Sequence, residues 1–195
     1  TSSEARRALG LDEAARVALF AGRFRWQKGL DVLLDAAALL EGRLPGLQIV
    51  IVGEGPLGGW VSQQLALRSL GDAVSVRERT SRMPLYYAAC DLVVMPSRAE
   101  GMPYVLLEAK AAGRPVVATL VTGMEEFVEH GRDGFLVPSE NPEALAGLLE
   151  ELLLSPDRLA EAGRCAWASL RPEWHARRSA ASILDLYRQL AGAAL

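Results

Sequence analysis

The chain has 195 residues, half of them hydrophobic, which is enough to bury one substantial core but short for two ordinary domains. Its net charge is −3 and its 21 Lys and Arg residues are spread along the chain, so we do not expect nucleic acid as a partner. No apolar run approaches the roughly 18 residues of a transmembrane segment, and the charged N-terminus is no signal peptide, so we expect a cytoplasmic domain. Cys90 and Cys165 are too far apart for a disulfide framework or a zinc site, and we expect both to be packing residues.

Short aliphatic runs alternate with longer stretches whose apolar residues recur every three or four positions. Such alternation is typical of a parallel sheet with helices on both faces, so the sequence predicts a doubly wound, Rossmann-like α/β fold. The predicted strands are Val17–Ala21, Leu47–Val52, Val74–Val76, Leu92–Met95, Pro115–Ala118 and Gly134–Val137. The predicted helices among them are Gly29–Leu40, Leu57–Leu70, Arg82–Ala89, Tyr104–Ala112, Met124–Glu129 and Pro142–Leu153.

The two ends of the chain depart from this alternation. Residues 1–15 are polar enough to form a linker or a frayed helix. After Pro156 the pattern predicts helices alone, over Arg158–Ala168 and Glu173–Leu190. We expect the apolar stripe of the last helix to pack on this same sheet, although residues 172–195 can instead pack on a domain absent from this chain; the stripe consists of Ile183, Leu184, Leu186, Tyr187 and Leu190.

The turns after the strands are the expected place for a ligand, because open parallel sheets bind ligands at the carboxyl ends of their strands. The turn after the first strand carries Arg23 and Lys28, five residues apart. Arg23 is suited to a bidentate contact and Lys28 to a mobile point charge, so this turn can close two positive charges around a diphosphate. Solvated surface cations are the alternative for this pair taken alone.

The turn after the fourth strand leads into a helix whose first residue we expect to be Pro103, where a missing N–H group costs nothing. The amides of Tyr104, Val105 and Leu106 would then point out of the helix end and, with the helix dipole, form an anion site.

Glu100 and Glu108 flank this predicted anion site, on the order of 10 Å apart. A nucleotide sugar has hydroxyl-rich rings at both ends of a diphosphate, so it needs acceptors at two ends and donors between them. Glu108 also lies on an apolar helix, where a buried carboxylate needs a partner. A surface salt bridge for Glu108 and a solvated loop for Glu100 form the alternative interpretation.

A second candidate site follows the second strand, where Gly53, Gly55 and Gly58 match the dinucleotide-binding pattern G-x-G-x-x-G. Glu78, about 20 residues further on, would be the ribose-binding acid of that pattern. Two features argue against this hypothesis: the pattern normally follows the first strand, and Pro56 removes a backbone donor from the loop.

Further short segments follow one another in a characteristic order. They are Gly22-Arg23 with Lys28-Gly29, Val52 to Pro56, Tyr86 to Asp91, Pro96-Ser97, Glu100-Gly101, Glu108-Ala109, Ala112-Gly113, Pro115 to Ala118, Gly131, Gly134 and Leu136 to Pro138. From about Val17 to Tyr187 the chain thereby resembles the C-terminal domain of family 4 retaining glycosyltransferases.

The resemblance implies the C-terminal half of a glycosyltransferase B fold, with an acceptor-binding N-terminal domain absent from this chain. It implies that Glu100 contacts the transferred sugar, that Glu108 binds the ribose hydroxyls, and that Arg23 and Lys28 neutralise the diphosphate leaving group. Further donor-binding residues implied by the resemblance are Gly22, Gly53, Gly101, Met102, Pro103, Tyr104 and Val105.

The full-length protein is then expected to be a retaining hexosyltransferase that uses a nucleotide-diphosphate sugar, and the isolated domain to be inactive. The resemblance implies neither a divalent metal nor a cofactor, and any contact with a membrane surface would be made through the missing domain. His130 and His175 match no catalytic histidine of the family, and we expect both at the surface.

Departures from the family pattern limit these implications. Glu78 stands where the family often has glycine, so the contacts that read the base do not carry over. Thr122 and Glu125 replace a glycine and a proline common in the family, so the contacts of the loop after the fifth strand do not carry over either. A regulatory domain that keeps the fold without the ligand is a third interpretation. Retention of Glu100 and Glu108 with both cations argues against it.

Overall fold

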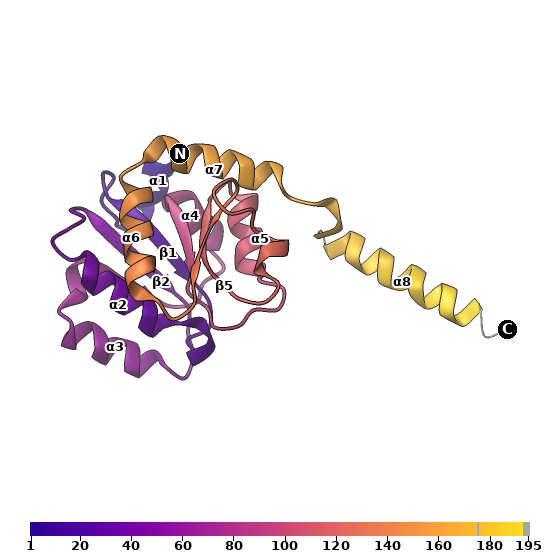
Figure 1. The fold of residues 1–195 in the computed structure, drawn as a ribbon, viewed down its shortest axis with the longest axis horizontal. Helices are drawn as coiled ribbons and strands as arrows, with labels where there is room; N and C mark the ends of the chain where they lie inside the picture. Colours follow the sequence, from indigo (N-terminus) through magenta and orange to yellow (C-terminus); the bar gives the residue numbers. More distant parts are fainter. Residues whose placement is uncertain (175, 193–195) are drawn as a thin grey trace.

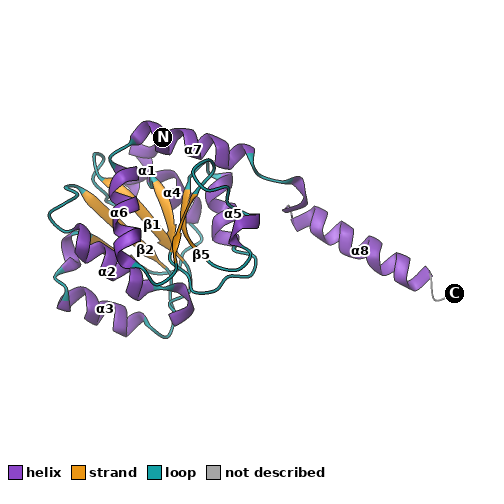
Figure 2. Cartoon of the chain, in the orientation of Figure 1, coloured by secondary structure: helices purple, strands orange, loops and turns teal. Residues whose placement is uncertain are grey.

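Six strands form one parallel sheet in the order β3-β2-β1-β4-β5-β6, seen in a computed structural model that describes residues 1–174 and 176–192 (Figures 1 and 2). The register is continuous along β1 and β2, from Arg16 opposite Leu47 to Ala21 opposite Val52. The predicted α/β fold with a parallel, doubly wound sheet is confirmed. The strands are β1 (Arg16–Ala21), β2 (Leu47–Val52), β3 (Val74–Arg77), β4 (Leu92–Met95), β5 (Val116–Leu120) and β6 (Phe135–Pro138).

Alternate residues of each strand point to opposite faces of the sheet, and both faces are apolar. In β1, Ala18 and Phe20 belong to one buried cluster, whereas Val17 and Leu19 belong to the other. Helices therefore cover both faces, as Figure 2 shows.

The helices divide between these two clusters. The first cluster includes residues of α2 (Leu30–Leu40), α3 (Gly58–Leu67), α6 (Pro142–Leu153) and α7 (Pro156–Ala168). The second includes residues of α1 (Ser2–Leu9), α4 (Met83–Ala89) and α5 (Tyr104–Ala111). Single 3-10 turns lie between these elements and before the last helix: η1 (Trp26–Lys28), η2 (Leu70–Asp72), η3 (Met124–Glu126) and η4 (Pro172–Trp174).

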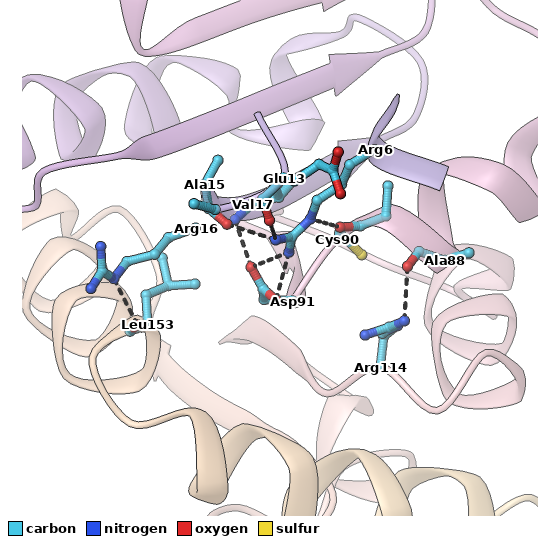
Figure 3. Close-up of polar contacts among 12 residues, drawn as sticks. Arg6, Glu13, Ala15, Arg16, Val17, Ala88, Cys90, Asp91, Arg114 and Leu153 are labelled. Atoms are coloured by element: carbon cyan, nitrogen blue, oxygen red, sulfur yellow. Dashed lines mark hydrogen bonds and ion pairs between the residues drawn. The ribbon is translucent and has the colours of Figure 1, made fainter. Parts of the chain in front are cut away.

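The N-terminal segment, for which the sequence predicted a linker or a frayed helix over residues 1–15, contains the capped helix α1. The Thr1 hydroxyl caps this helix by accepting a 3.3 Å hydrogen bond from the Glu4 amide. Arg6 is buried, and its guanidinium donates 2.8 Å hydrogen bonds to both carboxylate oxygens of Asp91 and further bonds to the carbonyls of Glu13, Ala15 and Ala89 (Figure 3). The sequence did not predict the buried position of Arg6, because most of its partners are backbone carbonyls, which no residue type reveals.

The helix predicted over Met124–Glu129 is wrong beyond its first turn, since the structure has only η3 there. The Glu129 amide donates to the Asp133 carboxylate at 2.8 Å, and this bond competes with helix continuation. Met124 and Val128 are still both buried, so their spacing fits the observed turn as well as a longer helix.

The C-terminal helix α8 (Ala176–Gly192) leads away from the sheet and its covering helices (Figure 1). The expectation that its apolar stripe packs on this sheet is wrong, because Ile183, Leu184, Leu186 and Tyr187 are 52–63% exposed. The side chain of Leu190 lies outside the described residues. Over residues 1–174 and 176–192, no helix has the length and apolarity to cross a membrane.

Candidate functional site

The order of the strands reverses between β1 and β4, and the loops after these two strands lie against each other. The Arg98 amide donates to the carbonyl of Gln27 at 2.8 Å. Gly29, at φ 65°, approaches the other loop so closely that a Cβ there would lie 1.8 Å from the carbonyl oxygen of Pro96. Glycine is therefore required for the contact that brings the two loops together at the switch point of the sheet.

Lys28 and Glu100, predicted separately on these two loops, form an ion pair. Lys28 Nζ lies 2.7 and 2.8 Å from the two carboxylate oxygens of Glu100, whose side chain is 7% exposed. The hydroxyl of Ser97 donates to Glu100 Oε1 at 2.6 Å. A buried carboxylate needs such partners, and these two donors fix its orientation at the loop surface.

Arg98, which sequence reasoning did not select, fastens the same two loops. Its guanidinium donates to both oxygens of Asp31, at 2.9 and 2.6 Å, and to the Trp26 carbonyl at 2.8 Å, and it stacks 3.9 Å from the Trp26 ring centroid. It also donates to Glu140 at 3.0 Å, and the hydrogen bonds with Asp31 raise the pKa of Arg98. The one sign of this role in the sequence is that Arg98 lies between Ser97 and Glu100 in the same turn.

A pocket of about 360 Å³ opens beside these loops at the carboxyl ends of β1 and β2. The predicted donor-binding residues that line it are Gly22, Arg23, Gly53, Val105 and Glu108. Lys28, Glu100, Gly101, Met102, Pro103 and Tyr104 are not among its lining residues. The structure thus brings one predicted cation and one predicted acid into the pocket and places the Lys28–Glu100 pair on the adjoining loops.

Glu108 and Arg23 are both exposed at this pocket. The Tyr87 hydroxyl donates to Glu108 Oε2 at 2.6 Å. Burial, followed by the bond with Glu108, raises the pKa of Tyr87, so the hydroxyl keeps its proton. In the sequence, Tyr87 belongs only to a segment of the family pattern. Its contact with Glu108 is visible only in the tertiary structure.

Helix α5 begins at Tyr104, with Pro103 as its cap and not its first residue. The amides of Tyr104 and Val105 make no hydrogen bond within residues 1–174 and 176–192, which leaves two donors at the helix end. The prediction of a third free amide is wrong, because Leu106 donates to the Pro103 carbonyl at 3.0 Å. Met102 and Tyr104 are 49% and 71% exposed at this end of the helix.

Six pocket residues were not among the predicted donor-binding residues: Ala21, Val52, Glu54, Arg79, Thr80 and Met83. Arg79 and Glu54 approach each other to 3.7 Å at the rim of the pocket. Arg79 belongs to the Arg77-Glu78-Arg79 run that departs from the family pattern, whereas Glu78 is exposed and does not line the pocket. The sequence shows that this run is charged. It does not show which of its side chains lines the pocket, because that depends on the conformation of the loop after β3.

The glycines of the dinucleotide pattern have a packing role. A Cβ on Gly53 would lie 1.9 Å from the Gly22 carbonyl oxygen, and one on Gly55 would lie 2.6 Å from the Phe24 carbonyl oxygen. The Phe24 amide donates to the Glu54 carbonyl at 2.8 Å and its carbonyl accepts from Leu57 at 3.1 Å. These glycines let the loops after β1 and β2 touch, so the dinucleotide hypothesis is not supported.

The remaining candidate polar residues lie elsewhere. His130 is exposed, and its Nδ1 accepts a 2.9 Å hydrogen bond from the Leu136 amide. His175 lies outside the described residues. Cys90 is fully buried, and Cys165 is partly exposed. In the described part of the chain, no group of three or more His, Cys, Asp or Glu side chains is placed to hold a metal ion.

Comparison with known proteins adds to this geometry. The chain is 38% identical to the D-inositol 3-phosphate glycosyltransferase of Corynebacterium urealyticum, with 97% of this chain and 46% of that protein aligned. The structure of Anabaena HepE in complex with UDP and glucose is similar with a TM-score of 0.79 and 30% identity, over 86% of this chain and 46% of that chain. Sucrose-phosphate synthase from Thermosynechococcus elongatus is similar with a TM-score of 0.87 and 29% identity, over 97% and 49%.

The chain therefore spans about half the length of the relatives that it matches. Residues 1–166 match the family described as glycosyl transferases group 1. This match covers the switch-point loops, the pocket and both glutamates. The chain belongs to the glycosyl transferases group 1 family and is the C-terminal half of a glycosyltransferase B fold.

Proposed function

We propose that this chain binds the nucleotide-diphosphate sugar of a retaining glycosyltransferase. The observation that carries the proposal is a pocket beside the sheet's switch point that contains an exposed cationic side chain, Arg23, and a carboxylate, Glu108. Helix α5 adds the amides of Tyr104 and of the pocket-lining Val105, which make no hydrogen bond in the described part of the chain. Cations and amides suit a diphosphate, and carboxylates suit the hydroxyls of a sugar.

Within this proposal, Glu108 binds the ribose and Arg23 the diphosphate. Lys28 and Glu100 act at the transferred sugar, where Lys28 stabilises the departing phosphate charge and Glu100 accepts from sugar hydroxyls. Gly101, Met102, Pro103 and Tyr104 shape the loop between the two glutamates. The pairing of Lys28 with Glu100 supports a shared location for these two roles.

The acceptor would be held by an N-terminal domain absent from this chain, as the partial coverage of the relatives suggests. We propose that the exposed stripe of α8 packs on that domain, since it has no cover in the described structure. Transfer would proceed with retention, without metal, and in the cytoplasm, where Cys90 and Cys165 stay reduced. The chain alone would bind donor and transfer nothing.

Isothermal titration of this chain with UDP, GDP and ADP, each with and without EDTA, tests the proposal. We expect micromolar to millimolar binding of at least one of them, unchanged by EDTA. Glu108→Ala should weaken that binding, whereas Glu41→Ala, at an exposed position outside the pocket, should not. No heat of binding from any of the three by the folded chain would overturn the proposal.

A further inference from the structure

Tyr87 does not line the pocket, but its hydroxyl makes one hydrogen bond to a residue that does, Glu108. The residue lies on α4, is 3% exposed, and packs in the cluster between α1, α4, α5 and the sheet. Its hydroxyl reaches α5 and donates to Glu108 Oε2 at 2.6 Å. The donor of this bond is therefore fixed by packing against the core.

Glu108 is the opposite kind of side chain, exposed at the pocket and attached through three rotatable bonds. Such a side chain loses rotamer freedom when it binds a ligand. In the structure Tyr87 already occupies Oε2, whereas Oε1 has no hydrogen-bond partner in residues 1–174 and 176–192. One carboxylate oxygen is thus anchored, and the other is available to a ligand in the pocket that Glu108 lines.

The direction of the hydrogen bond supports a lasting role. Burial raises the pKa of Tyr87 above its ordinary value, so the phenol keeps its proton near neutral pH and stays a donor. A carboxylate can only accept, and the pair is matched without any proton transfer. Ligand binding therefore does not need to displace Tyr87.

We propose that Tyr87 is a positioning residue that holds Glu108 for ribose recognition and so gives the site its preference for ribonucleotides over 2′-deoxyribonucleotides. The inference rests on the proposed function, because only a nucleotide offers Glu108 a ribose. A fixed carboxylate can accept from ribose hydroxyls with good geometry, and a mobile one does so with a loss of orientation. Removing the Tyr87 hydroxyl should therefore weaken binding of the ribonucleotide more than binding of its 2′-deoxy form.

The experiment compares Tyr87→Phe with Tyr86→Phe, the same chemical change one residue earlier on α4. Tyr86 is half-buried, and its hydroxyl makes no hydrogen bond within the described residues. Titrations use whichever of UDP, GDP and ADP binds the unmodified chain most tightly, together with the 2′-deoxy form of that nucleotide. Because both ligands report on the same folded molecules, their affinity ratio does not depend on the folded fraction.

We expect the unmodified chain and Tyr86→Phe to prefer the ribonucleotide equally. Tyr87→Phe should reduce that preference by about threefold to tenfold, the range for the loss of one ordinary hydrogen bond. Glu108→Ala should abolish the preference, and adding Tyr87→Phe to Glu108→Ala should change the ratio no further.

An unchanged preference in Tyr87→Phe would overturn the inference while the proposed function stands. If both affinities also fall by the same factor, the hydroxyl is purely structural. Equal binding of both nucleotides by the unmodified chain would also overturn it, since Glu108 would then not read the ribose. Absence of all nucleotide binding by the unmodified chain contradicts the proposed function itself.

Discussion

Lys28 and Glu100 neutralise each other before any ligand arrives. A diphosphate that recruits Lys28 has to share it with a carboxylate that is 7% exposed, and a sugar hydroxyl that reaches Glu100 meets an acceptor already bonded to Ser97. Arg23, in contrast, is exposed in its loop. The two cations of the site therefore differ in what their removal leaves behind.

Replacing Lys28 with Ala should reduce both affinity for nucleoside diphosphate and stability. The affinity loss should be about 1.5–3 kcal/mol if Lys28 makes a charge-assisted bond to phosphate. The stability loss should be about 1–2 kcal/mol, because Glu100 loses its charged partner while Lys28 itself is partly solvated. Titration calorimetry and urea unfolding measure the two effects.

Arg23→Ala is the matched comparison, with a similar loss of affinity and no loss of stability. A Lys28→Ala protein as stable as the unmodified chain would contradict the importance of the ion pair. Unchanged affinity in either variant would remove that residue from the site.

The two cysteines should differ sharply in reactivity. Burial raises the pKa of Cys90 to about 12, so at pH 8 only about one part in ten thousand of its thiol is ionised in the folded protein. Iodoacetamide should label the partly exposed Cys165 and spare Cys90 until denaturant is added, as peptide mass spectrometry can show. Equal labelling of both in the folded chain would mean that the segment between α4 and β4, which carries Cys90, opens readily.

The residues of the site were partly visible in the sequence. Arg23, Lys28, Glu100 and Glu108 could be selected because they follow predicted strands and flank a predicted helix start. Tyr87 and Arg98 could not, because their roles arise from contacts between segments, such as the 21 residues that separate Tyr87 from Glu108. A sequence shows which groups can donate or accept, but the partner is decided by packing.

At the scale of elements, close approach between loops builds the site. Gly29 lets η1 lie against Pro96, and Gly53 and Gly55 let the loop after β2 lie against residues 22–24. The glycines of the second loop matched a dinucleotide pattern because any close approach to the backbone requires glycine, whether the neighbour is a cofactor or another loop. Spacing alone therefore could not distinguish the two.

Gly29→Ala should destabilise the chain by about 2–4 kcal/mol, from the left-handed backbone and the contact with the Pro96 carbonyl, and should weaken nucleotide binding. Gly42→Ala is the control, since Gly42 has a similar φ of 72° and open space around its Cβ position. That control should cost only about 1–2 kcal/mol and leave binding intact. Equal losses in both variants, measured by urea unfolding, would contradict a specific role for the loop contact.

Strands were better predicted than helix ends. The aliphatic runs fix the buried strands because each run must lie between two covered faces, and the observed bounds differ from the predicted ones by at most two residues. Helix ends depend on individual competing bonds. The Asp133 carboxylate that captures the Glu129 amide is an example, and nothing in the local periodicity announces it.

On the scale of the whole molecule, α8 stands apart from the sheet and its other helices. A stop after Trp174 should leave the melting temperature within about 2 °C of the full chain, because the exposed stripe of α8 contributes little burial. Trp174→Ala should lower it by about 2–4 °C, because the Trp174 ring lies 5.5 Å from that of Phe127. Differential scanning fluorimetry measures both, and a large drop on truncation would mean that α8 folds back on this half.

The Arg6–Asp91 network lies where β1 and β4 begin (Figure 3). The Lys28–Glu100 pair lies beyond the points where the same strands end. Six residues of strand, roughly 20 Å, separate the two sets of charges. The Arg6 network can therefore contribute to stability without touching the proposed donor site at the opposite rim of the sheet. A directed-evolution campaign can alter stability through the residues around Arg6 while it selects donor specificity among residues at the other rim.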